Sequence, residues 1–143
     1  MAKSTLLPCA VARGRGPARW AVEGAADLAL AVADAEIVLV ATPVGDLPHT
    51  VREVLDGAPA GCTVTDVGST KGPVCAAAGD DARFVGGHPI CGAETRGPDR
   101  ASADLFEGAT WFMTPTARTS PERLRLVHGF VSSLGARPVA IGP

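Results

Sequence analysis

One short apolar run decides the fold of this chain: Glu36-Ile37-Val38-Leu39-Val40-Ala41-Thr42. The run has the length of a strand, is rich in β-branched residues and is almost continuously apolar, which is typical of a strand buried on both faces of a parallel sheet. The turn-forming residues Pro43 and Gly45 follow it, and Asp46 can cap a helix whose apolar positions recur at helical spacing. A buried strand followed at once by a helix predicts a βα unit.

The same alternation of β-branched runs and amphipathic stretches continues to the end of the chain, so we predict an α/β domain with a mostly parallel sheet. The predicted strands are 36–42, 62–67, 83–88, 109–114 and 137–141, and the predicted helices are 25–33, 47–55, a short one ending at 78, and 120–134 with Ser120 as its cap. The first residues of the chain do not share this pattern. We therefore divide the chain into an irregular N-terminal segment, 1–24, and an α/β domain, 25–143.

Length and composition indicate one ordered domain with a small-molecule partner. A chain of 143 residues can bury one hydrophobic core. With 46% apolar and 20% charged residues it is too hydrophobic for a disordered tail, and charges and prolines interrupt it too often for a transmembrane helix. The net charge of −2, from 13 basic and 15 acidic residues, argues against nucleic acid and anionic membranes as partners.

The cysteines and the N-terminus indicate a cytoplasmic protein without a metal site. Cys9, Cys62, Cys75 and Cys91 form no Cys-x-x-Cys pair, and no histidine lies at zinc-finger spacing. We therefore expect reduced thiols and no bound metal. Pro8 interrupts the short apolar run near the start of the chain, which argues against a signal peptide.

Polar residues stand where the predicted strands end, and in an open α/β sheet ligands bind beyond the carboxyl ends of the strands. Three such places carry candidate functional groups: Thr42 with Pro43, the segment 66–71, and the glycine-rich segment 86–92 with Glu94 just beyond it. Because parallel strands share one carboxyl edge, we expect these groups to converge there.

His88 is the candidate proton acceptor among them. An imidazole titrates near neutral pH and is well suited to accept a proton from a substrate hydroxyl. A histidine between glycine and proline is also a common turn residue bonded to backbone, so the local sequence leaves both interpretations open. The other two histidines, His49 and His128, lie within predicted helices, where we expect surface or packing roles.

The segment after the second strand leaves similar alternatives. Ser69 can cap the next helix or contact a ligand. Lys71 can place a cation over the ligand site, although a solvated lysine on the first turn of a helix is the simpler interpretation. Asp66 can equally be a strand-end residue bonded to nearby backbone.

The usual dinucleotide-binding turn, Gly-x-Gly-x-x-Gly between a strand and a helix, is missing from the sequence. Gly14-Arg15-Gly16-Pro17-Ala18-Arg19 supplies two of the three glycines, but it contains a proline, has arginine at the third glycine position and follows no convincing strand. We interpret it as a chance match.

Four blocks of sequence occur in a defined order and spacing. They are Asp34-Ala35-Glu36-Ile37-Val38-Leu39-Val40-Ala41-Thr42-Pro43-Val44, Thr65-Asp66-Val67-Gly68-Ser69-Thr70-Lys71, Val85-Gly86-Gly87-His88-Pro89-Ile90-Cys91-Gly92-Ala93-Glu94 and Leu105-Phe106-Glu107-Gly108-Ala109-Thr110. Together they resemble the prephenate dehydrogenase family over residues 25–143. The resemblance implies the later half of a Rossmann-like nucleotide-binding domain. The implied reaction is oxidative decarboxylation of prephenate to 4-hydroxyphenylpyruvate in tyrosine biosynthesis, with NAD or NADP as hydride acceptor.

The resemblance also implies roles for single residues. His88 matches the family's catalytic histidine, which hydrogen-bonds the ring hydroxyl of the substrate as hydride leaves the same carbon. Ser69 matches a catalytic serine that touches both the nicotinamide region and that hydroxyl. Thr42 and Pro43 match a turn that lines the cofactor, and Glu94 matches an acidic residue near the substrate pocket.

Two parts of the family pattern are not recognisable in this sequence: the glycine-rich first turn with its acidic ribose-binding residue, and the C-terminal helical domain that forms the dimer. We therefore expect a truncated member of the family, which forms a homodimer only where that helical domain is present. Two other hypotheses stay open. One is a dehydrogenase of another hydroxy acid, such as arogenate or a β-hydroxyacid, and the other is a non-catalytic binding domain that kept the fold and lost the cofactor.

Overall fold

The computed structural model describes residues 28–92, 102 and 104–142. Its helices are α1 (Leu28–Val32), α2 (Leu47–Gly57), α3 (Gly72–Ala78) and α4 (Pro121–Ser133), and its strands are β1 (Ile37–Val40), β2 (Thr63–Asp66), β3 (Phe84–Ile90), β4 (Thr110–Pro115) and β5 (Arg137–Ala140). Each of these elements overlaps one that the sequence predicts. The predicted domain boundary at residue 24 lies outside the described residues.

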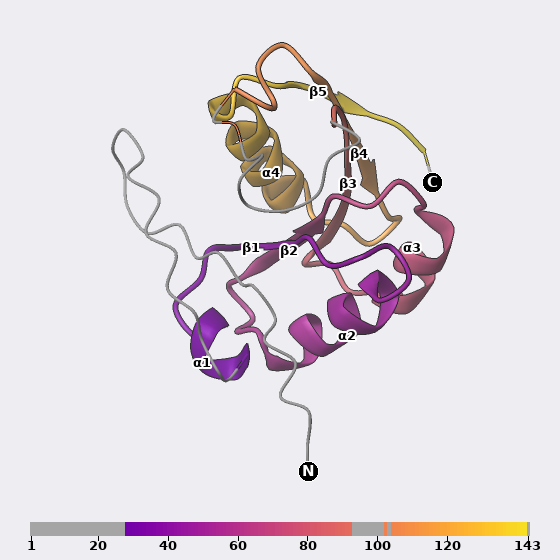
Figure 1. Ribbon diagram of the computed structural model, residues 1–143. Helices are drawn as coiled ribbons and strands as arrows, with labels where there is room; N and C mark the ends of the chain where they lie inside the picture. The colour runs from indigo at the N-terminus through magenta and orange to yellow at the C-terminus, as the bar shows by residue number, and fades with distance from the viewer. Residues whose placement is uncertain (1–27, 93–101, 103, 143) are drawn as a thin grey trace.

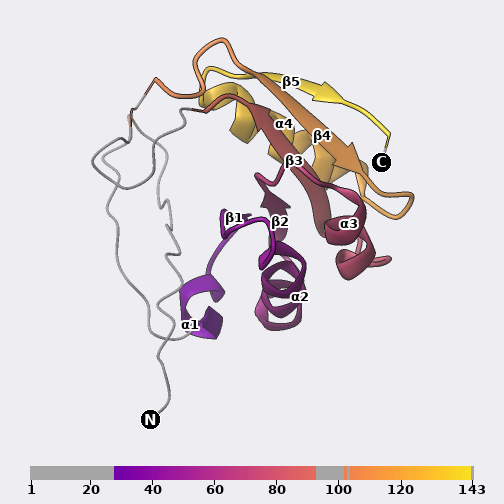
Figure 2. The same cartoon turned by 45° about the vertical axis from the view of Figure 1, so that its right-hand side comes forward.

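The five strands form one sheet in the order β1-β2-β3-β4-β5 (Figure 1). β1, β2 and β3 run parallel to one another, β4 is antiparallel to β3, and β5 is parallel to β4. The sheet is therefore mostly parallel, as predicted, with one antiparallel junction. In Figures 1 and 2, α4 lies on one side of the sheet and α1, α2 and α3 lie together on the other.

Two apolar clusters join the helices to the two faces of the sheet. The cluster on the side of α1–α3 includes Val54 and Phe84, and the cluster on the side of α4 includes Trp111 and Val127. All four side chains are almost completely buried. The indole ring of Trp111 also packs against Phe106, with ring centroids 5.1 Å apart. Burial of apolar surface on both faces is the main term that stabilises such a three-layer arrangement.

Two helices begin at the residues that the sequence predicts, by different means. Ser120 caps α4, because its side chain accepts the backbone N–H of Arg123. Asp46 occupies the cap position of α2, but its side chain makes no capping hydrogen bond. The carbonyl oxygen of Pro43 accepts the N–H groups of Asp46 and Leu47 instead, at 2.9 and 3.1 Å.

β1 is less buried than its sequence predicts. The run 36–42 is typical of a strand covered on both faces, but Ile37, Val38 and Leu39 are only partly buried. The reason is topological, because within the described residues β1 pairs with β2 alone and forms an edge of the sheet. β2 has the interior position, and all four of its residues are buried.

β3 is longer than predicted. The sequence predicts a strand that ends at His88 in a glycine-rich turn, but β3 continues to Ile90 and His88 lies inside it. The cause is β4, which pairs antiparallel with residues 85–90 and places Phe112 opposite His88. Pairing with a distant segment thus overrides the local turn preference of glycine and proline.

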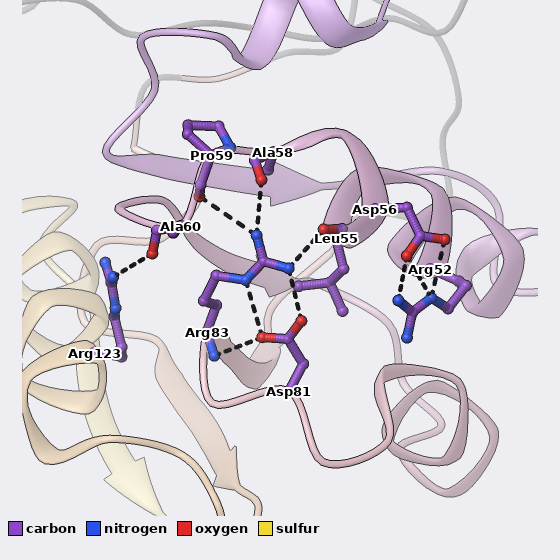
Figure 3. A network of polar contacts seen from close by, with 9 residues as sticks. All are labelled: Arg52, Leu55, Asp56, Ala58, Pro59, Ala60, Asp81, Arg83 and Arg123. Atoms are coloured by element: carbon purple, nitrogen blue, oxygen red, sulfur yellow. Dashed lines mark hydrogen bonds and ion pairs between the residues drawn. The ribbon is translucent and has the colours of Figure 1, made fainter.

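Two arginines hold the connection between α2 and β2 (Figure 3). Arg83 donates to the carbonyl oxygen of Leu55 at 2.6 Å, and the carboxylate of Asp81 binds the same guanidinium through two nitrogens at 3.0 and 2.7 Å. Arg123, from α4, donates to the carbonyl oxygen of Ala60 at 2.9 Å. These side chains satisfy carbonyl groups that the end of a helix and the following turn leave without backbone partners.

Candidate active site

The carboxyl ends of β1, β2 and β3 share one edge of the sheet because the three strands are parallel. Thr42 lies just beyond β1, Asp66 is the last residue of β2, and Ser69 follows in the connection to α3. His88 lies in β3 beyond Val85, the last β3 residue that pairs with β2. The strand register therefore places the three candidate segments at one edge, as the sequence predicts.

Asp66 is the centre of a buried polar network at this edge. Its side chain is fully buried, and its carboxylate accepts the backbone N–H of Gly68 at 2.9 Å and that of Gly87 at 3.0 Å. It also forms an ion pair with the ammonium group of Lys71. The interpretation of Asp66 as a strand-end residue bonded to nearby backbone is confirmed, and the bond to Gly87 adds a contact with β3.

Lys71 is not the solvated lysine of the simpler interpretation. Its side chain is only 12% exposed, and its ammonium group binds both the carboxylate of Asp66 and the carbonyl oxygen of Gly87, the latter at 2.6 Å. The sequence carries little sign of this pair, since Asp66 and Lys71 belong to different elements and share no helical spacing. The two are brought together by the turn through Gly68, whose N–H group also binds Asp66.

His88 is half-buried and lies on a strand. The alternation of β3 puts it on the face of Phe84, which belongs to the core beside α1–α3, and not on the face of Val85. Phe112 lies opposite it on β4, and the next β3 residue on the same face, Ile90, is 50% exposed. No hydrogen bond ties the imidazole to the backbone within the described residues. A partly accessible imidazole on a rigid strand is well placed to bind a ligand group.

The other two histidines are exposed, so the structure shows the surface role and not the packing role among the two expected. His49 lies in α2 and His128 in α4, and both side chains face solvent. His88 is thus the only one of the three that the fold holds at the carboxyl edge.

Thr42 and Pro43 form the turn between β1 and α2. Thr42 is half-buried, and its hydroxyl lies 3.4 Å from that of Thr50 in α2. Pro43 is exposed, and its carbonyl oxygen accepts the N–H groups of Asp46 and Leu47 at the start of α2. Both residues stand at the carboxyl edge, where a ligand bound across the ends of β1 and β2 would meet them.

Ser69 is exposed and does not cap α3, whose cap position is Lys71. Of the two alternatives for Ser69, the structure therefore excludes capping. Glu94, the candidate substrate-binding residue, lies outside the described residues.

The thiols of Cys75, in α3, and of Cys91, which directly follows β3, are protonated at neutral pH. Burial raises the pKa of the Cys91 thiol, and burial is also the largest cause that raises the pKa of the Cys75 thiol. A nucleophilic thiolate is therefore not favoured at either position. Among the described residues, no group of three or more His, Cys, Asp or Glu side chains could hold a metal ion. None of the helices described is long and apolar enough to cross a membrane.

A mostly parallel sheet with helices on both faces, and with polar groups at the carboxyl ends of its strands, defines a Rossmann-like nucleotide-binding domain. Residues 18–140 match the family described as prephenate dehydrogenase, nucleotide-binding domain, and the chain belongs to that family.

Curated relatives agree with this assignment. The chain is 32% identical over 117 residues to prephenate dehydrogenase of Bacillus subtilis (strain 168), a match that covers 78% of this chain and 32% of the relative. It is 26% identical over 125 residues to prephenate dehydrogenase of Lactococcus lactis subsp. cremoris (strain MG1363), which covers 83% of this chain and 35% of the relative. The chain thus spans about a third of the length of these relatives.

Solved structures give the same result. The arogenate dehydrogenase of Synechocystis superposes with a TM-score of 0.73 at 29% identity, covering 83% of this chain and 43% of that one. The prephenate dehydrogenase of Aquifex aeolicus, in complex with hydroxyphenyl propionate and NAD+, superposes with a TM-score of 0.68 at 32% identity, covering 76% of this chain and 38% of that one.

Proposed function

We propose that this chain carries the catalytic histidine of an NAD(P)-dependent prephenate dehydrogenase, which converts prephenate to 4-hydroxyphenylpyruvate and carbon dioxide. The observation that supports this most directly is the placement of His88. It is a half-buried imidazole on β3, at the carboxyl edge where open α/β sheets bind their ligands. The backbone N–H and C=O groups of its neighbour Gly87 are both hydrogen-bonded.

The carboxyl edge fits part of a dinucleotide. Thr42 and Pro43 form the turn beyond β1, and Ser69 is exposed beyond β2. The charge of Asp66 is already paired with Lys71, so it does not oppose an anionic ligand. A glycine-rich cradle for the pyrophosphate is not among the residues that the structure describes. From the resemblance to the family, we assign Thr42 and Pro43 to the turn that lines the cofactor and Ser69 to the nicotinamide region.

The reaction needs a base at the substrate hydroxyl. When bound, NAD or NADP supplies the hydride acceptor. His88 accepts the hydroxyl proton while the C–H electron pair of the same carbon leaves as hydride, so that a carbonyl forms. Loss of carbon dioxide then returns the electrons to that oxygen, the ring becomes aromatic, and His88 returns the proton to the phenolic oxygen. Ser69 holds the hydroxyl beside His88, and Glu94 contributes to the substrate pocket.

Arogenate is the second candidate substrate. The similarity to the Synechocystis arogenate dehydrogenase favours it, at an identity close to that of the prephenate dehydrogenases. Arogenate carries an amino group where prephenate carries a keto group, at a distance from the reacting ring carbon. His88 and Ser69 therefore have the same roles for both substrates.

The test is the absorbance at 340 nm after the purified chain is mixed with prephenate or arogenate and with NAD or NADP. We expect slow turnover that His88→Ala abolishes and that His128→Ala, a change at an exposed position on α4, leaves unchanged. Measurable turnover at equal rates in the two variants would contradict the role of His88. Absence of turnover, together with an unchanged melting temperature at saturating NAD and NADP, would favour the non-catalytic domain, because a ligand that binds only the folded state raises its stability.

A further inference from the structure

We infer that Asp66 and Lys71 are positioning residues for His88. Their side chains bind the backbone of Gly87, the residue before His88, at a position where β2 supplies no pairing residue. This inference rests on the proposed function, which makes His88 the proton acceptor. It adds a role for two charged residues whose side chains bond to each other and to the backbone of Gly68 and Gly87. Their effect is exerted through the backbone of Gly87.

The pairing of β2 with β3 stops two residues before Gly87. The last pair is Thr65 with Val85, after which β2 ends at Asp66 and the chain turns towards α3. In an extended strand the N–H and C=O groups of one residue point to the same side. Those of Gly87 point towards β2, where no further strand residue meets them.

Side chains complete the pairing at this position. The carboxylate of Asp66 accepts the N–H of Gly87 at 3.0 Å, and the ammonium group of Lys71 donates to its carbonyl oxygen at 2.6 Å. One acceptor and one donor thus satisfy the same two groups that a neighbouring strand would satisfy. The direct pairing of Asp66 with Lys71 neutralises both charges in a buried environment, where an unpaired charge would be strongly unfavourable.

The network leaves the backbone before His88 little freedom. β4 pairs with β3 on the other side, with Met113 opposite Gly87 and Phe112 opposite His88. Gly86 and Gly87 have no side chains to restrict their own dihedral angles, so their conformation depends on these outside contacts. Without Asp66 and Lys71, a two-glycine segment directly before His88 would be held from the β4 side alone. The orientation of the imidazole would then be less defined.

The experiment compares two double variants that each remove one ion pair. Asp66→Asn with Lys71→Met removes the buried pair without leaving an unpaired charge. Arg52→Met with Asp56→Asn removes an exposed pair on α2 and is the matched control. The readout is the nuclear magnetic resonance spectrum of the three imidazoles, in which His49 and His128 serve as internal references, and hydrogen exchange of the Gly87 amide.

We expect the first double variant to shift and broaden the ring signals of His88 while those of His49 and His128 stay in place. The Gly87 amide should exchange about tenfold faster, because an amide oxygen at position 66 is a weaker acceptor than a carboxylate and the donor to the Gly87 carbonyl oxygen is lost. The control should change neither. Asp66→Asn alone keeps the shape of the side chain and should shift the His88 signals in the same direction, but by less. This single variant replaces the double variant in the test if the double variant does not fold. His88 signals identical to wild type in a folded variant would overturn the inference.

Turnover gives a second readout and separates this inference from the proposed function. If the wild-type chain is active, the first double variant should lower kcat at least tenfold and leave KM within about twofold, because the base is displaced while the substrate contacts remain. An unchanged kcat would contradict positioning. If the wild-type chain is inactive on prephenate and arogenate, the proposed function fails, and the spectra of His88 still decide whether Asp66 and Lys71 position it.

Discussion

Gly87 lies where β3 passes close to the end of β2. A Cβ atom added here would overlap the carbonyl oxygen of Asp66 and would lie 2.9 Å from Nε1 of Trp111 and 3.0 Å from Oγ1 of Thr65. Backbone and a buried indole cannot move aside as an exposed side chain can. Gly87→Ala is therefore expected to destabilise the fold by about 3 kcal/mol, measured by urea denaturation.

Gly129 provides the control for the substitution at Gly87. It lies inside α4, is exposed, and an added Cβ would meet no atom within 4 Å. Gly129→Ala should stabilise the protein by about 0.8 kcal/mol, because alanine favours the helix more than glycine does. A stabilising effect of Gly87→Ala as well would show that β3 and β2 are further apart than the structure has them.

Cys91 and Cys75 illustrate how burial changes a residue's chemistry. Burial raises the pKa of both thiols, and for Cys75 the nearby charge of Lys71 opposes that rise in part. A protonated thiol is a poor nucleophile. Alkylation by iodoacetamide at pH 7 should accordingly be slower at both positions than for free cysteine, and mass spectrometry of digested protein can follow each site. Faster alkylation at Cys91 than in a model peptide would contradict this.

At the scale of the elements, Arg83 joins the end of α2 to the start of β3. It donates to the carbonyl oxygens of Leu55 and Ala58 and is held by Asp81. Arg83→Met would remove these bonds and leave partly buried acceptors without a partner, at a cost of about 2 kcal/mol in the free energy of unfolding. The matched control is Arg52→Met, which removes an exposed i,i+4 pair and should change that free energy by less than about 0.5 kcal/mol.

The same contact predicts how stability depends on pH. Hydrogen bonds from Arg83 are the largest cause that lowers the pKa of Asp81. The stabilisation is therefore fully present above the unfolded-state pKa of about 3.9, and it is lost as the pH falls through the lower folded-state pKa. Between about pH 6 and pH 2, wild type should lose more stability than Arg83→Met. Denaturation curves at each pH measure this, and parallel losses in the two proteins would contradict the assignment.

At the scale of the whole molecule, the sheet separates two cores. Val54 belongs to the core beside α1–α3 and Val127 to the core beside α4, and both are almost fully buried. Val54→Ala and Val127→Ala should each cost about 2 kcal/mol, and together about 4 kcal/mol, because the two side chains belong to separate apolar clusters. The double variant should still unfold in one cooperative transition. A combined loss that differs from the sum by more than about 1 kcal/mol would indicate coupling across the sheet.

The sequence by itself determined the type and order of the elements. The apolar run before Pro43 and the helical spacing after it are local patterns. A strand and a helix can be predicted from them without knowing which elements they pack against. Ser120 likewise identifies the start of α4, because a cap needs only the next turn of backbone. The position of His88 at the end of a predicted strand, and its match to a family histidine, selected the central candidate of the site.

Only the tertiary structure decided the relations between these elements. Among the residues that the structure describes, β1 is an edge strand, β4 extends β3 through His88, and the Asp66 and Lys71 pair is enclosed against Gly87. Each of these outcomes depends on residues that are distant in sequence, whereas periodicity and capping report only on neighbours a few positions away. Burial of a charged side chain is the extreme case, because it is set by what the rest of the fold places around it.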